Sequence, residues 1–187
     1  MKHRTKARWI LVAVLSVVIM HVGVARAGTP TAAQINRDAE AALARLYETT
    51  PAAARLGKDA VAILVFPSVL KAGFMVGGQF GNGALRQGDK SIGYYNVTAA
   101  SYGLQAGAQR FGYAMFFMKE SALEYLNKSG GFEVGVGPSV VLVDEGMAKT
   151  LTSSTARDDI YAFIFGQQGL MAGMGLQGSK ITKFTPE

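Results

Sequence analysis

The chain has 187 residues, of which 49% are apolar and 17% charged, with 23 glycines and no cysteine. Such a chain is too apolar and too weakly charged to be disordered, and its length suits a single domain. It contains no run of 18 apolar residues, so the sequence predicts no clear transmembrane helix.

The first 27 residues have the three parts of a secretory signal peptide. Basic residues precede an apolar run over residues 9–20, and Ala25-Arg26-Ala27 supplies the small residues that signal peptidase reads. We therefore expect a leader over 1–27 and a single mature domain over 28–187, exported to the periplasm, to the outer membrane or out of the cell. An uncleaved N-terminal anchor is the alternative, because residues 10–24 extend the apolar stretch.

Removal of this leader changes the chemistry that the chain can perform. The net charge falls from +6 to +1, so a nucleic-acid partner is not expected. Both histidines, His3 and His21, lie in the leader, and the mature chain therefore has neither His nor Cys. A His- or Cys-ligated zinc site and the Ser–His–Asp and Cys–His catalytic arrangements are excluded. We expect no catalytic residue, no metal, no cofactor and no enzyme activity.

The mature chain begins with a helical pattern. Thr31 and Gln34 have the spacing of a capping box, and apolar residues from Ile35 to Tyr47 follow at helical intervals. We expect this helix to pack on a sheet, because it has too few cations to favour an anionic surface. Pro51 suits the first turn of a second short helix that ends near Gly57.

Strand patterns dominate from residue 60 onward. Residues 61–66 read as a buried strand, and Gly81-Asn82-Gly83 reads as a hairpin turn because Asn and Gly tolerate positive φ. Residues 119–127 read as a helix, and 144–159 as a loop or a partly paired strand. The remaining strands are expected at residues 72–80, 91–100, 102–109, 112–118, 132–136, 139–143, 160–165 and 170–184.

Glycine recurs in almost every expected strand, which is typical of bends, bulges and close backbone approach. The predicted fold is therefore α+β, with N-terminal helices packed on a Gly-rich, strongly curved antiparallel β-sheet that approaches a barrel. The expected core consists of Leu43, Leu46, Val61, Ile63, Val65, Phe74, Phe116, Val141, Phe163 and Phe165.

Charge is distributed unevenly along the mature chain. Residues 71–119 carry five basic residues against Asp89 alone, whereas residues 120–159 have a net charge of −4. The central strands are thus suited to meet anionic lipid headgroups. The alternative is that these charges are scattered around the sheet and serve only solvation.

Four segments resemble the SYLF lipid-binding domain family over about residues 31–184. They are AILVFPSVLKAGFMVGGQFGNGAL, IGYYNVTAASYGLQAGAQ, SGGFEVGVGPSVVLV and FIFGQQGLMAGMGLQGSKITKF. The resemblance implies phospholipid binding, which eukaryotic members perform with a basic surface and an N-terminal amphipathic helix. It also implies small exported bacterial relatives made of one such domain.

The resemblance and the charge pattern together predict a phospholipid-binding protein of the bacterial cell envelope that recognises anionic membrane headgroups. The expected lipid-binding residues are Lys71, Arg86, Lys90, Arg110 and Lys180. Replacing Lys71 and Arg86 should leave the fold intact, because both side chains are expected to be exposed. The alternative function is a protein-interaction or structural component of the envelope whose lipid affinity is incidental.

The leader predicts a mature N-terminus at or near Gly28, because Ala25-Arg26-Ala27 ends the signal. The intact mass of the exported protein should therefore lack residues 1–27. A mass that includes these residues would support the anchor instead.

Overall fold

The structure is a computed structural model that describes residues 29–152, 154–169 and 178–187, so the expected leader lies outside the described residues. Four helices are described: α1 (Ala32–Thr49), α2 (Pro51–Asp59), α3 (Glu120–Ser129) and α4 (Glu145–Thr150). The described strands are β1 (Ala62–Gln87), β2 (Lys90–Phe117), β3 (Gly131–Glu133), β4 (Val140–Leu142), β5 (Ile160–Gly169) and β6 (Lys180–Phe184). None of these described helices has the length and hydropathy of a membrane span.

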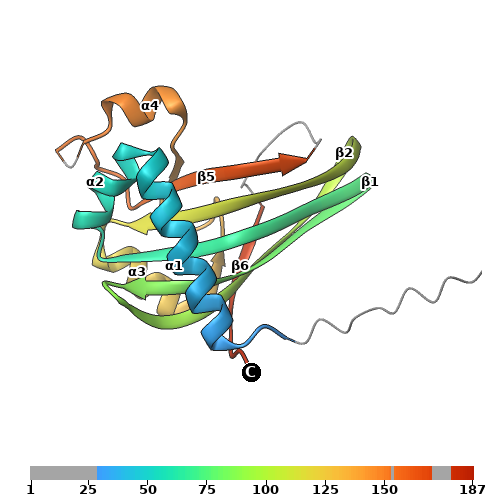
Figure 1. The fold of residues 1–187 in the computed structure, drawn as a ribbon, viewed down its shortest axis with the longest axis horizontal. Helices are drawn as coiled ribbons and strands as arrows, with labels where there is room; N and C mark the ends of the chain where they lie inside the picture. Colours follow the sequence, from blue (N-terminus) through green and yellow to red (C-terminus); the bar gives the residue numbers. More distant parts are fainter. Residues whose placement is uncertain (1–28, 153, 170–177) are drawn as a thin grey trace, which may run out of the picture.

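The strands form one strongly curved sheet, a half-barrel, in the order β3-β6-β2-β5-β4, with β1 paired along β2 (Figure 1). The α+β class and the strong curvature predicted from the sequence are confirmed. The sheet is mixed rather than wholly antiparallel, because β4 runs parallel to β5.

The two long strands, β1 and β2, generate most of the curvature. β1 pairs with β2 from Ala62 opposite Phe117 to Gln87 opposite Lys90, and the pairing is irregular between Phe74 and Val76. There the strand pair bends, so β1 has a first arm before the bend and a second arm after it. Figure 1 shows both long strands extending together to one end of the molecule, away from α2, α3 and α4.

The two arms of β1 approach each other closely along one line of contact, which we call the crease. Glycines occupy the second arm at this contact, so no side chain separates the two backbones. A Cβ atom on Gly81 would lie 2.9 Å from both the Ser68 carbonyl oxygen and Val69 Cγ2. A Cβ atom on Gly83 would overlap the Val65 carbonyl oxygen and the ring of Phe66. Since ordinary Cβ atoms do not come this close, any larger residue at these positions forces the arms apart.

Each face of the sheet has its own core. On one face, α3 packs over a cluster that includes Phe66, Tyr95 and Tyr113. On the other face, α1 and α2 cover a second cluster, in which the ring of Phe163 packs edge-on against that of Phe116 with centroids 5.1 Å apart. The capping box of Thr31 and Gln34 is present at the start of α1, as predicted.

Most of the expected core is confirmed. Leu46, Ile63, Val65, Phe116 and Phe163 are buried. The partly buried members of the set, all packed against one of the two clusters, are Leu43, Val61, Val141 and Phe165.

Three further expectations about the fold are wrong. Phe74 is not in the core, because it lies at the bend with 75% of its surface exposed. Gly81-Asn82-Gly83 is not a turn: it lies inside β1, and the chain reverses at Gly88 and Asp89 instead. The polar stretch over 144–159 contains the short helix α4, for which the Asp144 side chain accepts a hydrogen bond from the Met147 N–H.

Replacing Gly83 by Ala should destabilise the fold by about 1–3 kcal/mol, because the new methyl group has no space at the crease. Gly78→Ala is the matched control, since a Cβ atom there meets only the Ala99 carbonyl oxygen at an ordinary 3.5 Å. Urea unfolding of the two variants measures the difference. Equal stability of both variants would contradict the crease.

Candidate lipid-binding surface

The structure separates the five basic residues that the sequence analysis selected. Lys71 is buried inside the sheet, and Arg86 is buried beside α1. Lys90 is exposed at the turn between β1 and β2. Arg110 and Lys180 are exposed on strands nearer the bend. The five residues therefore do not form one surface patch, and two of them do not have the predicted exposure.

Lys71 is only 8% exposed, because an irregularity in β1 turns its side chain to the buried face of the sheet. The register shift between Phe66 and Val69 is a β-bulge, after which Val69 and Lys71 point to the same side as Phe66. Lys71 lies opposite Gln109, which is also buried. Lys71 is therefore part of the interior and is not a surface contact for a membrane.

Other polar side chains of the described chain are buried as well. The Gln79 side chain donates a hydrogen bond from Nε2 to Ser179 Oγ at 2.8 Å, and both residues are buried. The Tyr113 hydroxyl is buried as well, and burial raises the pKa of this phenol far above its ordinary value. These groups were not singled out by sequence reasoning, because nothing in the local pattern distinguishes a buried Gln from an exposed one.

Arg110 and Lys180 each belong to a row of side chains that crosses the sheet. Cross-strand partners project on the same face, so Arg110 lies beside Leu70 and its next neighbour Gln168. In the second row, Phe80 lies opposite Thr98, and Thr98 lies opposite Lys180. Each row thus combines an exposed apolar residue of β1 with an exposed cation on another strand.

The two rows approach each other at the crease. Leu70 and Phe80, 46% and 52% exposed, both line one shallow hollow near the start of α1. Asp38 also lines this hollow, and Glu133 lies opposite Lys180 on β3. The cations therefore have carboxylates nearby, but among the described residues neither Arg110 nor Lys180 forms an ion pair.

The bend, residues 73–77, carries three consecutive exposed apolar side chains. Phe74, Met75 and Val76 are 75%, 55% and 64% exposed. Together with Leu70 and Phe80 they place five large exposed apolar side chains within eleven residues of β1. Such a concentration on one surface is typical of a binding site for another molecule or a membrane.

The backbone at Met75 is strained. Its φ is +60°, in the left-handed region that L-residues with side chains seldom adopt. Holding a non-glycine residue there costs roughly 1–3 kcal/mol. The sequence signal for this bend is the stretch Gly-Phe-Met-Val-Gly, in which glycines flank three large apolar residues.

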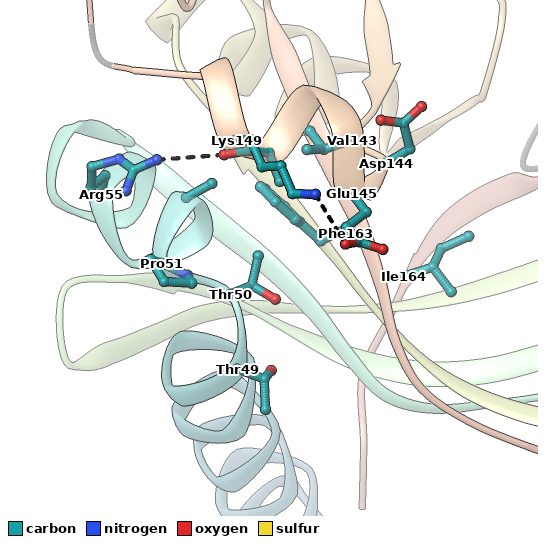
Figure 2. Close-up of a pocket in the computed structure, with 12 residues that line it drawn as sticks. Thr49, Thr50, Pro51, Arg55, Val143, Asp144, Glu145, Lys149, Phe163 and Ile164 are labelled. Atoms are coloured by element: carbon teal, nitrogen blue, oxygen red, sulfur yellow. Dashed lines mark hydrogen bonds and ion pairs between the residues drawn. The ribbon is translucent and has the colours of Figure 1, made fainter.

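A groove of about 520 Å³ lies elsewhere, between α2, α4 and β5 (Figure 2). Its charged groups are engaged within the protein: Arg55 Nη2 donates to the carbonyl oxygens of Ala148 and Leu151, and Lys149 pairs with Glu145 at 3.3 Å. Asp144 caps α4. The Arg55 hydrogen bonds fasten α4 to α2, whereas the Lys149–Glu145 pair and the Asp144 cap are contacts within α4.

The adjacent acids Asp158 and Asp159 also have structural roles. Asp159 accepts hydrogen bonds from Lys119 Nζ at 2.8 Å and from the Ser139 N–H, and these donors hold the pKa of its carboxyl below the ordinary value. Asp158 accepts a hydrogen bond from the Tyr161 hydroxyl. Among the described residues, no group of three or more His, Cys, Asp or Glu side chains is placed to hold a metal.

Comparison with known proteins agrees with the sequence resemblance. Residues 98–186 match the Ysc84 family model, described as Las17-binding protein actin regulator. This segment contains most of β2 and every later element, including Arg110 and Lys180. No curated protein matches the chain.

Proposed function

We propose, from the membership of residues 98–186 in the Ysc84 (SYLF) family, that the protein is a non-enzymatic phospholipid-binding protein of the bacterial cell envelope. This family is linked to the binding of lipids or of actin regulators. It contacts a membrane with the bend end of the half-barrel and recognises anionic headgroups. The expected leader supports export to the envelope. This function needs no catalytic residue, cofactor or metal.

The exposed apolar bend is the observation that carries the proposal. Phe74, Met75 and Val76 keep more than half of their surface exposed. Moving a large apolar side chain from full exposure to full burial is worth about 1.5–3 kcal/mol, so each of them has part of that gain still available. Insertion of these three side chains at the boundary between headgroups and acyl chains supplies that burial. The bend lies at the end away from α2, α3 and α4, so insertion there leaves both cores intact (Figure 1).

The cations of the two rows suit the headgroups of the same membrane. Leu70 lies four residues before Phe74, so the row of Arg110 is roughly 13 Å behind the bend at about 3.3 Å per residue. When the bend reaches the acyl boundary, Arg110 is therefore close to the headgroup layer. A basic side chain near an anionic leaflet contributes about 1 kcal/mol, and added salt screens this attraction.

The charge part of the proposal is tested with the double variant Arg110→Gln, Lys180→Gln. Binding of the purified protein to vesicles of phosphatidylcholine, alone or mixed equally with phosphatidylglycerol, is measured by flotation. The double variant should bind the anionic vesicles about tenfold more weakly or worse. Lys90→Gln is the matched control, because it removes an exposed cation at the opposite end and should leave binding unchanged.

The apolar part is tested with Phe74→Ser, Val76→Ser, which should lose binding to both kinds of vesicle. Both residues are exposed, so the urea unfolding midpoint should stay close to that of the parent. Vesicle binding that survives this change, or that falls as much in Lys90→Gln as in the double charge variant, would reject the bend as the membrane contact. Absence of vesicle binding by the parent protein would favour a protein partner instead.

A further inference from the structure

A second candidate site lies at the other end of the half-barrel from the bend. It is a pocket of about 310 Å³ between α1, the end of α2 and the turn that joins β1 to β2, and we refer to it as the turn pocket. Its polar lining consists of Glu40 and Tyr47 from α1, Arg86 from β1 and Asp89 from the turn. Liquid water occupies about 30 Å³ per molecule, so the pocket holds a ligand of roughly ten heavy atoms.

Arg86 lines the turn pocket with an incompletely satisfied charge. The residue is only 8% exposed, and its side chain makes one long hydrogen bond to the described residues, from Nη2 to the Asp89 carbonyl oxygen at 3.3 Å. Within the same described part of the chain, no carboxylate lies within ion-pair distance of its guanidinium. A guanidinium has five N–H donors, so most of those of Arg86 are left for water or for a ligand in the pocket that the residue lines. Arg86 therefore favours an anionic group in the pocket.

Tyr47 supplies a neutral hydroxyl beside this charge. The Tyr47 oxygen lies against Gly57 of α2 and makes no hydrogen bond to the described residues. Burial raises the pKa of this phenol, and the positive charge of Arg86 opposes the rise. The hydroxyl thus keeps its proton at neutral pH and can donate to an anion that Arg86 holds.

Two exposed carboxylates, in addition to Arg86 and Tyr47, line the turn pocket. Glu40 and Asp89 both line the pocket and are exposed, yet neither pairs with Arg86. A simple anion would meet repulsion from both carboxylates, and a simple cation would meet the guanidinium. A molecule with an anionic group at one end and an ammonium at the other satisfies both.

We propose that the turn pocket binds a small zwitterion, with its phosphate or carboxylate on Arg86 and Tyr47 and its ammonium against Glu40 and Asp89. The site is independent of the proposed membrane contact, because the two lie at opposite ends of the half-barrel. The same chemistry is present in a free aminoalkyl phosphate and in the headgroup of a phosphatidylethanolamine lipid. Phosphoethanolamine fits the available volume and serves as the probe.

Titration calorimetry of the purified protein with phosphoethanolamine, inorganic phosphate and ethanolamine tests the site. Phosphoethanolamine should bind more tightly than either of its halves. Arg86→Lys, which keeps the charge but loses the two-pronged geometry, should weaken binding about tenfold. Arg110→Gln should not change it, because that exposed cation lies far from the pocket.

Glu40→Gln separates a zwitterion site from an anion site without touching a buried group. It should weaken phosphoethanolamine binding but strengthen inorganic phosphate binding. Glu48→Gln, an exposed acid on the same helix that does not line the pocket, is the matched control. No heat with phosphoethanolamine, or an equal response of both ligands to Glu40→Gln, would overturn the proposal.

Phosphatidylethanolamine vesicles distinguish the two sources of the ligand. If free phosphoethanolamine displaces the protein from these vesicles, and Arg86→Lys reduces vesicle binding, the pocket takes a lipid headgroup. If phosphoethanolamine binds the pocket while vesicle binding is the same in Arg86→Lys, the ligand is a free small molecule. Either result supports the zwitterion site, whereas phosphoethanolamine binding that does not depend on Arg86 contradicts it.

Discussion

The half-barrel depends on the contact between the two arms of β1 at the crease. Gly81 lies on Ser68 and Val69, and Gly83 lies on Val65 and Phe66, with no side chain to separate the backbones. Hydrophobic cores have little free space, so even one methyl group at such a contact displaces its neighbours. Because β2 is hydrogen-bonded to both arms, it follows the same path, and β5 and β6 are aligned on β2 in turn.

This folding-back gives the two ends of the sheet different chemistry. The bend end exposes Phe74, Met75 and Val76 with Arg110 behind them, whereas the turn end is covered by α1 and α2 and encloses the guanidinium of Arg86. The strained Met75 lies where a smooth strand would otherwise continue. Strain at an exposed apolar position persists only when its surroundings enforce it, and here the crease does so.

Local sequence rules predicted α1, α2 and α3 but missed the short helix α4. Capping and helical periodicity act over a few residues, as at Thr31, so they are visible in the sequence. These rules failed where a contact between residues far apart in the sequence determines the local structure. A glycine needed for close approach, such as Gly83, has the same local signature as one needed for a turn. The predicted exposure of Lys71 failed because one bulge after Phe66 reverses the face of the strand. Pro67 lies in that bulge, but a proline at this position is equally typical of the end of a strand. The resemblance to the SYLF family indicated the function class, but not which of the cations reach the surface.

The central claim is that the bend enters a membrane, and a fluorescent label at Phe74 tests it most directly. The chain has no cysteine, so Phe74→Cys and Ile92→Cys each accept one environment-sensitive dye, the second at an exposed position near the opposite turn. On adding anionic vesicles, the dye at position 74 should brighten and shift to the blue, while the dye at position 92 should not change. A response at position 92 alone, or none at position 74 when the protein is bound to vesicles, would contradict the account.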